Sequence, residues 1–253
     1  MRMATLLITL LSSIKIINIE GCIMYLFIKK LFLPFLLVLL ASCSAIYQPN
    51  SLNIPILGKK SEGTLIVGTG SNTFEVQSAY AITDNYAIML NYSKTNNNDR
   101  KKFKQNLGEF AVGYFNLFNK TKVVEIYLGG GYGESSSLGS SIFMHIVDTT
   151  LQTNSAFYRF FIQTNYGIKG KVVEAGIALR ASFLHFKEIK INGLSGNKLN
   201  DNFLVAPALF LRIGGPVIKL KAQISFSSLL SSSNLFLYEP LIISVGIVLR
   251  IGS

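Results

Sequence analysis

The sequence predicts an all-β protein: an antiparallel up-and-down transmembrane β-barrel of about ten strands, with eight as the alternative, preceded by a signal peptide and a short tether. Three observations favour this fold. From residue 63 onward, short runs alternate apolar and polar residues with a period of two. The connections between these runs alternate between short and long. Although 49% of the 253 residues are hydrophobic, no stretch after residue 43 reaches the roughly 18 to 20 continuous apolar residues of a spanning helix.

Residues 1–42 are predicted to be an N-terminal extension and an export signal. Lys29-Lys30 precede the apolar run 31–39, which is too short to span a bilayer, and Leu40-Ala41-Ser42-Cys43 follows directly. Because residues 24–30 would form a complete signal start by themselves, Met24 is a possible true start. This tetrapeptide resembles the lipobox of bacterial lipoproteins. The resemblance implies that Cys43 is diacylated on sulfur, becomes the mature N-terminus and requires lipoprotein-processing machinery. The alternative is a buried N-terminal helix with an ordinary core cysteine.

Residues 43–62 are predicted to be the tether, and residues 63–253 the barrel. The stretch from Tyr47 to Gly58 contains Pro49, Asn50, Asn53 and Pro55. It resembles the tether that follows the lipid-bearing cysteine in many lipoproteins.

Composition narrows the choice of partners. Loss of four basic residues and Glu20 with the N-terminal segment leaves 20 of the 24 basic and 12 of the 13 acidic residues, a net charge of +8. An exported chain of this kind does not usually meet nucleic acid, so phosphate-bearing lipid headgroups are the expected anionic neighbours. Because Cys22 leaves with the signal, Cys43 is the remaining cysteine, which excludes a disulfide framework and a cysteine-type zinc site. The sequence indicates neither a metal site nor a cofactor.

The expected strands are bounded by turn or loop residues. In order, they are 63–70, 73–83, 86–94, 107–116, 123–133, 156–168, 172–183, 203–213, 217–227 and 238–251. The run 172–183 is the clearest, because Val173, Ile177 and Leu179 fall on one face while Glu174 and Arg180 fall on the other.

The connections set the orientation of the predicted barrel. From the second strand onward, short connections such as Gly170-Lys171 alternate with longer ones such as 134–155. Outer-membrane barrels have short periplasmic turns and longer extracellular loops, so both ends of this barrel are expected in the periplasm. The first connection, Ser71-Asn72, is short where a surface loop is expected. The tether is then predicted to place the lipid of Cys43 in the periplasmic leaflet of the outer membrane.

On this pattern, the region from residue 63 to the C-terminus resembles the small outer-membrane barrels of the OmpA/OmpX-like class. The resemblance implies integration into the outer membrane by barrel-assembly machinery. The C-terminal residues 250–253 lack the terminal aromatic residue that serves many such barrels as an insertion signal.

Aromatic residues near the strand ends are predicted to form two girdles at the membrane surfaces. The candidates are Tyr80, Tyr86, Tyr92, Tyr114, Tyr132, Tyr158, Tyr166 and Phe226. Tyr158 and Tyr166 are eight residues apart, which corresponds to roughly 20 Å vertically on a tilted strand.

The polar face of the strands is predicted to line the lumen and form a network of ion pairs and hydrogen bonds. Its charged members are Glu75, Glu109, Glu125, Arg159, Glu174, Arg180, Arg212, Lys219, Lys221 and Arg250. A barrel of about this strand number is nearly filled by its own side chains, and unpaired buried charges are costly. A closed lumen is therefore expected, with a narrow small-solute channel as the alternative.

The remaining candidates lie in the predicted loops. Basic residues in 94–104 are placed to contact lipid phosphates. His145 and His185 fall at the outer rim, where they could serve a hydrolase, but no catalytic motif accompanies them.

The leading interpretation is therefore a lipid-anchored outer-membrane barrel, not an enzyme, with a structural, envelope-stabilising or surface-interaction role. A lipid-anchored soluble carrier, resembling lipocalins and having its apolar face inside, is a further alternative.

Overall fold

The computed structural model describes residues 46–97, 102–140, 150–192, 194–195, 201–230 and 238–252. Within these ranges the chain forms ten long strands: β1 (Gly63–Gly70), β2 (Thr73–Ala81), β3 (Tyr86–Asn97), β4 (Lys102–Phe118), β5 (Lys122–Ser140), β6 (Thr150–Ile168), β7 (Val173–Ile191), β9 (Asn202–Gly214), β10 (Ile218–Phe226) and β12 (Leu241–Ile251). Two short strands, β8 (Leu194–Ser195) and β11 (Ser228–Leu229), pair with β7 and β9. No helix in this described part is long and apolar enough to cross a bilayer.

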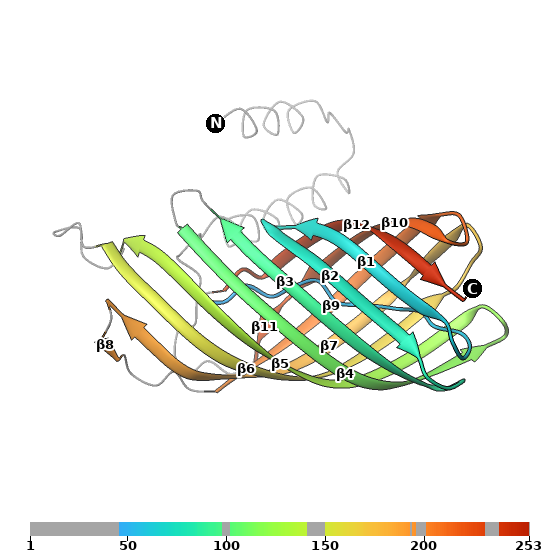
Figure 1. The fold of residues 1–253 in the computed structure, drawn as a ribbon, viewed down its shortest axis with the longest axis horizontal. Helices are drawn as coiled ribbons and strands as arrows, with labels where there is room; N and C mark the ends of the chain where they lie inside the picture. The colour runs from blue at the N-terminus through green and yellow to red at the C-terminus, as the bar shows by residue number, and fades with distance from the viewer. Residues whose placement is uncertain are drawn as a thin grey trace, which may run out of the picture. The chain divides into compact units, whose positions relative to one another are not determined.

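The ten long strands close into one antiparallel barrel (Figure 1). Each pairs with the next long strand along the chain, and β12 pairs with β1 from Gly63↔Ile251 to Gly70↔Ser244. The predicted up-and-down barrel of ten strands is confirmed, and the eight-strand alternative is wrong. Ser71 and Asn72 join β1 to β2 with φ angles of 45° and 61°, as in the type I′ turns of tight hairpins. This tight turn explains why the connection between β1 and β2 is short where a surface loop is expected.

Side chains alternate between the lumen and the exterior along every long strand. In β10, Lys219, Lys221 and Gln223 are buried, whereas Leu220 and Ile224 are exposed. Leu128 and Leu220 each expose 66% of their surface, which is unusual for leucine in a protein surrounded by water. Because the polar face points inward, the lipocalin-like alternative, which requires an apolar interior, is wrong.

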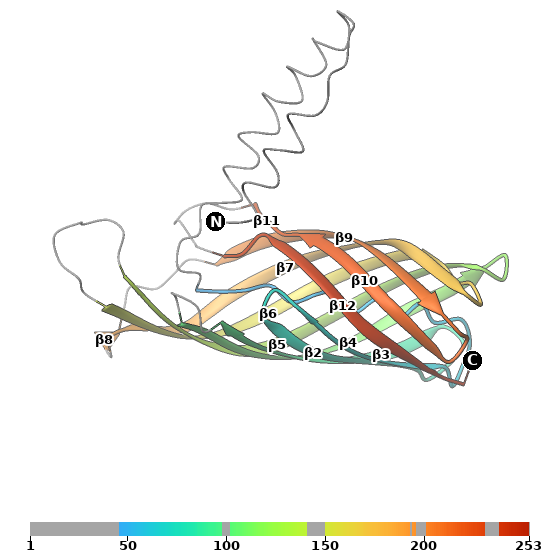
Figure 2. The same ribbon diagram turned by 90° about the horizontal axis from the view of Figure 1, so that it is seen from above.

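The barrel wall has two unequal heights. β5, β6 and β7 each have 19 residues, whereas β1 has 8 and β2 and β10 have 9. The longer strands extend past the shorter ones at the end that carries the longer connections (Figures 1 and 2). We call this the long-loop end, its opposite the short-turn end, and strands β4–β7 the tall wall.

The predicted strands 107–116, 123–133, 156–168 and 172–183 stop too early at the long-loop end. Beyond Tyr132 and Tyr158 the outward positions become polar, with Glu134, Ser136 and Asn154. The alternation of apolar and polar residues therefore disappears there, although the backbone pairing continues as far as Ser140↔Thr150.

A segment of main chain fills the lumen. Residues 46–62, which we call the lumenal segment, pass through the barrel from the long-loop end to the start of β1 (Figures 1 and 2). All residues from Tyr47 to Leu57 are buried. Residues 47–57 of the predicted tether therefore lie inside the barrel, where both polar and apolar side chains find partners, whereas Lys59, Lys60 and Ser61 are exposed.

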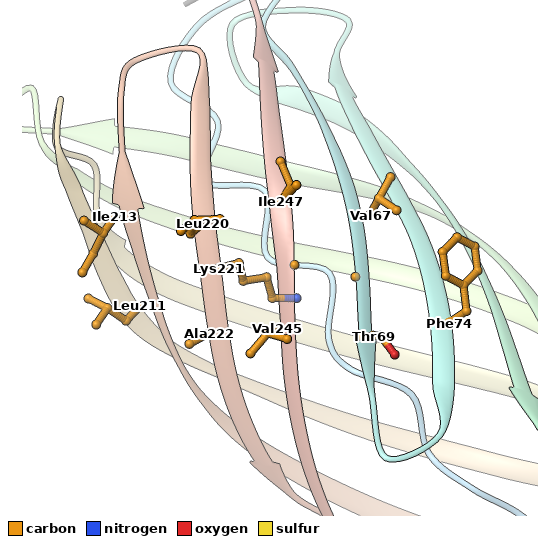
Figure 3. A pocket seen from close by; sticks show the side chains of 12 residues that line it. Val67, Thr69, Phe74, Leu211, Ile213, Leu220, Lys221, Ala222, Val245 and Ile247 are labelled. Carbon is orange, nitrogen blue, oxygen red and sulfur yellow. The ribbon is translucent and has the colours of Figure 1, made fainter. Parts of the chain in front are cut away.

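The exterior carries a shallow apolar groove of about 760 Å³ across β9, β10, β12, β1 and β2 (Figure 3). Outward side chains such as Leu211, Leu220, Val245, Ile247 and Phe74 surround it. It is continuous with the apolar exterior of the barrel.

Candidate functional site: the occupied lumen

At the long-loop end, the lumenal segment is held at the level where the tall wall begins to extend beyond the shorter strands. Ser135 Oγ donates a hydrogen bond to the carbonyl of Ile46 at 2.7 Å. Arg159 Nη1 donates to the Tyr47 hydroxyl at 2.6 Å, and the Tyr47 ring meets Phe157 edge-on with centroids 5.3 Å apart. Tyr47 also forms a parallel bridge with Tyr238, which precedes β12. The segment therefore contacts opposite sides of the barrel at this end.

Further toward the short-turn end, the side chain of Gln105 takes the place of a neighbouring β-strand. Its Oε1 accepts from the backbone N–H of Gln48 at 3.0 Å, and its Nε2 donates to the carbonyl of Gln48 at 2.7 Å. This reciprocal pair satisfies both backbone groups of Gln48, as a neighbouring β-strand would.

Asn50 and Ser51 bind carboxylates of the wall. The Asn50 amide donates to Glu109 Oε2 at 3.1 Å, and its oxygen accepts from Arg159 Nη2 at 2.7 Å. The backbone N–H of Ser51 donates to Glu75 Oε1 at 2.6 Å, and the Ser51 hydroxyl donates to the other oxygen of Glu75. Both carboxylates are thereby used by the segment.

Asn53 connects the segment to both sides of the barrel. Its Nδ2 donates to Asn91 Oδ1 at 2.7 Å on β3, while its carbonyl accepts from Gln163 Nε2 at 2.6 Å on β6. Because the lumen is narrow, one extended residue can reach opposite walls.

The lower part of the segment is bound by arginines. Arg212 donates to the carbonyls of Ile54 and Pro55, the latter at 3.3 Å. Arg250 Nη1 donates to the carbonyl of Ile56 at 3.2 Å. On the other side, Glu125 Oε1 accepts from the N–H of Leu57 at 2.9 Å. Carbonyls and N–H groups that would otherwise be buried without partners are satisfied here.

Glu62 fastens the segment at the short-turn end. Its carboxylate accepts from the N–H of Gly58 at 2.7 Å, from Arg250 Nη1 at 2.8 Å and from Lys169 Nζ at 2.6 Å. Lys169 lies in the β6–β7 turn, where burial lowers the pKa of its ammonium group and the adjacent Glu62 carboxylate opposes that shift. Ala81 N donates to the carbonyl of Glu62 at 2.8 Å, which leads the chain into β1.

Apolar side chains of the segment fit against small inward residues. Leu52, Ile54 and Ile56 are buried in a cluster with four wall residues from β5, β7 and β9 and with Phe210. These four wall residues are Val123, Ala178, Ala206 and Ala208. A Cβ atom on Gly167 would lie 2.7 Å from Ile56 Cδ1. Ile56 has a φ of 58°, which is rare for a β-branched residue and requires a surrounding structure that holds it.

Wall charges also pair with one another. Arg159 and Arg180 both contact Glu109, the latter at 3.5 Å. Glu174 contacts three bases: Arg250 at 2.7 Å, Arg212 at 3.4 Å and Lys219 at 3.9 Å. Each of these two acids therefore contacts more than one base, and Arg159, Arg212 and Arg250 also donate hydrogen bonds to the lumenal segment.

All ten predicted lumen charges are buried, each with at most 5% of its surface exposed: Glu75, Glu109, Glu125, Arg159, Glu174, Arg180, Arg212, Lys219, Lys221 and Arg250. The expected pairing across the wall involves Glu109 and Glu174, whereas Glu75 and Glu125 bind the lumenal segment. The expectation that wall side chains alone fill the lumen is wrong, because main chain occupies it.

The eight predicted girdle residues all point outward: Tyr80, Tyr86, Tyr92, Tyr114, Tyr132, Tyr158, Tyr166 and Phe226. Tyr86 and Tyr114 are cross-strand partners with ring centroids 5.7 Å apart, and Tyr132 and Tyr158 are partners at 5.4 Å.

The remaining candidates from the sequence are Cys43, the basic residues of 94–104 and the two histidines. Cys43, Arg100, Lys101 and His145 lie outside the described residues. Lys94, Lys102 and Lys104 are exposed on β3 and β4. His185 Nδ1 lies 2.6 Å from Asp201 Oδ1 in an exposed pair at the long-loop end. The structure describes no group of three His, Cys, Asp or Glu residues arranged to hold a metal ion.

The sequence prediction missed the residues of the lumenal segment, Glu62 included, and the wall residue Gln105. One signal was present: Leu52, Ile54 and Ile56 recur with a period of two, separated by Asn53 and Pro55, as apolar residues do in the barrel strands. Such alternation is unusual in a solvated tether.

One side of the lumen has few contacts with the segment. Both polar atoms of the Gln223 amide and the hydroxyls of Ser225 and Ser244 lack hydrogen-bond partners within the described chain. These residues belong to β10 and β12, and Lys221 faces the lumen beside them.

No family model and no curated protein matches this chain. Three solved structures with similarity are membrane-protein domains. The translocator domain of autotransporter NalP from Neisseria meningitidis has a TM-score of 0.47 and 13% identity over 75% of this chain and 86% of that one. The β-domain of the Bordetella autotransporter BrkA has a TM-score of 0.38 and 11% identity over 74% and 97%. The N-terminal β-barrel domain of Pseudomonas aeruginosa OprF has a TM-score of 0.34 and 9% identity over 76% and 99%.

Proposed function

We propose that the protein is an outer-membrane β-barrel, anchored additionally by lipid on Cys43, whose lumen is closed by its own N-terminal segment. Its role is structural, envelope-stabilising or surface-interacting rather than conductive. The observation that carries this proposal is the burial of residues 47–57 within a wall that forms hydrogen bonds with both backbone and side-chain groups of the segment.

The composition of the exterior supports a membrane location. Between the Tyr86–Tyr114 pair and the Tyr132–Tyr158 pair, the outward positions carry residues such as Phe110, Leu128 and Phe160. Beyond the second pair they carry Glu134 and Asn154. An apolar band with tyrosines at its edges and charges beyond them matches the cross-section of a bilayer. In water, so large an apolar surface would promote aggregation.

The occupied lumen supports a closed barrel. A channel needs a continuous polar path, whereas here Leu52, Ile54 and Ile56 pack against the wall in the lower half of the lumen. Ion pairs with Glu109 and Glu174 also hold lumenal bases such as Arg159 and Arg250 in place across the lumen. The narrow-channel alternative would need a path along Gln223 and Ser244, on the side with few contacts.

The tall wall supports a surface-interaction role. Its outward face beyond Tyr132 holds a polar hollow of about 490 Å³ between Lys104, Glu134, Glu188 and Lys190. Above a membrane, this face would be the most prominent part of the protein.

Membrane integration is testable by gel mobility and extraction. A folded barrel is expected to migrate differently on a denaturing gel with and without boiling, and to remain in the membrane pellet after carbonate washing. Release into the wash together with an unchanged mobility would contradict the proposal.

Closure is testable in planar bilayers. The wild-type protein is expected to give no stepwise conductance. In the matched control, Gly and Ser replace residues 47–57 at the same length; this variant is expected to conduct, because it keeps the wall and loses the packed segment. Discrete openings of the wild type would overturn the closed-lumen proposal.

A further inference from the structure

The direction in which the chain runs through the lumen is defined at both ends. Gly63 pairs with Ile251 and Tyr80 beside the short turns, so the lumenal segment leaves the barrel there to begin β1. At the other end, Ile46 accepts a hydrogen bond from Ser135 on the tall wall, and Tyr47 bridges to Tyr238. Ile46, the first described residue, therefore lies at the long-loop end.

The distance between the ends excludes a return path for Cys43. Cys43 lies three positions before Ile46, and three extended residues span at most about 11 Å. Tyr158 and Tyr166, which mark the two edges of the apolar band on β6, are eight residues apart, or about 26 Å along the strand. The lumen between these levels is already filled. Cys43 therefore cannot reach the short-turn end, which contradicts the periplasmic lipid position that the sequence suggested.

The path of the lumenal segment and the short reach of the residues before it bear on the side of the membrane on which the N-terminus lies. We propose that the N-terminal end is displayed on the cell surface and that the acyl chains of Cys43 enter the outer leaflet. The lipid part of this statement rests on the proposed function, whereas the side on which the chain emerges rests on the path of the lumenal segment.

The geometry of the rim allows a lipid there to reach the bilayer. Ser135, which holds Ile46, is three residues beyond Tyr132, or about 8 Å vertically on a tilted strand. The tall wall stands on one side, but β12, β1 and β2 are short, and the Tyr238 bridge draws the segment toward β12. From this side, the few residues up to Cys43 are long enough to return to the headgroup region.

This topology also constrains assembly. Drawing acyl chains through a finished lumen would remove them from the bilayer and pull them past buried charges. The β1–β12 seam therefore closes around a segment that is already in place. The segment is joined directly to β1, which makes this order possible.

Single-cysteine labelling in intact cells tests the topology. A membrane-impermeant maleimide is applied to three variants, each first checked for heat-modifiable mobility. Ala45→Cys lies next to the predicted surface end. Leu230→Cys replaces a residue that is 70% exposed at the long-loop end. Gly215→Cys lies in the short β9–β10 turn, where a Cβ atom has space.

We expect Ala45→Cys and Leu230→Cys to be labelled in intact cells, and Gly215→Cys only after permeabilisation. Labelling of Ala45→Cys only after permeabilisation, with Leu230→Cys labelled in intact cells, would overturn the threading direction. The reverse pattern for Leu230→Cys and Gly215→Cys would overturn the assignment of the surface.

The wild-type protein tests the lipid separately. A diacylated Cys43 is a thioether and is expected to remain unlabelled even after denaturation. Labelling of denatured wild type would overturn the acyl placement, and the threading result would then be read from the same three variants carrying Cys43→Ser as well. Loss of heat-modifiable mobility in the wild type would instead contradict the membrane barrel itself.

Discussion

The β2–β5 side of the lumen and the β6–β12 side hold the same segment by opposite chemistry. On the first side, Glu75 and Glu125 accept hydrogen bonds from the backbone N–H groups of Ser51 and Leu57. On the second, Arg212 and Arg250 donate to carbonyls between Ile54 and Ile56. An extended backbone presents donors and acceptors on both of its edges, so one acidic and one basic wall can satisfy it.

This difference explains the charge separation along the sequence. Among the lumen-facing residues, β2, β4 and β5 carry the acids Glu75, Glu109 and Glu125, whereas bases outnumber the single acid Glu174 from β6 to β12. A lumen stabilised only by cross-wall ion pairs would need each acid to reach a base. Here Glu109 and Glu174 do so, while Glu75 and Glu125 bind main chain instead. The separated charges thus resemble a binding site for a peptide more than a simple ion-pair network.

The largest expected effect comes from removing what both walls bind. Replacement of residues 47–57 by Gly and Ser removes five large buried apolar side chains, Tyr47, Leu52, Ile54, Ile56 and Leu57, each worth about 1.5 to 3 kcal/mol. We expect the free energy of unfolding to fall by more than about 5 kcal/mol, since wall hydrogen bonds are lost as well. Urea unfolding in detergent micelles, followed by gel mobility, measures it. An unchanged midpoint would mean that the wall is stable without the segment.

The next comparison sets a base against an acid. Arg212→Met leaves Glu174 with fewer partners, the carbonyl of Ile54 without its donor and the carbonyl of Pro55 with only Arg250 Nη2 at 3.5 Å, which should cost about 3 to 5 kcal/mol. Glu125→Gln keeps an oxygen for the N–H of Leu57 and disturbs mainly the hydrogen bond from Asn165, at about 1 kcal/mol. The same urea titration measures both variants. Equal losses would show that the charge of the side chain, rather than its hydrogen-bond geometry, determines its contribution to stability on both sides of the lumen.

A smaller effect is expected where the wall makes room for the segment. Gly167→Ala would place a methyl group 2.7 Å from Ile56 Cδ1 and should destabilise the barrel by about 1 to 3 kcal/mol. Combining it with Ile56→Ala should cost less than the sum of the two single changes. Gly108→Ala is the matched control, because its Cβ would have no atom within 4 Å. Strict additivity in this double-mutant cycle would argue against the contact.

The smallest effect is expected outside the lumen. Lys190 and Glu188 form an ion pair at 2.9 Å, but both side chains are about half exposed. Lys190→Ala should therefore change the free energy of unfolding by less than about 1 kcal/mol. The contrast with Arg212→Met tests whether burial decides the value of a charge in this barrel. A loss as large as that of Arg212→Met would refute this.

The inward and outward assignment of the strands was predictable because it is local. In a strand, side chains alternate with a period of two, so Glu174 and Arg180 could be placed on the face opposite Ile177 from sequence alone. The same regularity gave the turns and the number of strands. It did not predict where β4–β7 end at the long-loop end, because beyond Tyr132 the outward face meets water and no longer needs apolar residues.

The contents of the lumen could not be derived in this way. Neither the alternation in Leu52, Ile54 and Ile56 nor the prolines around it specifies which partner covers these side chains. That partner is assembled from β5, β7 and β9, far along the chain, and becomes a single surface only when β12 closes on β1. The sequence by itself therefore determined the wall, since each residue's face depends on its immediate neighbours. Only the tertiary structure decided what the wall encloses and from which end the chain enters, because both depend on closure.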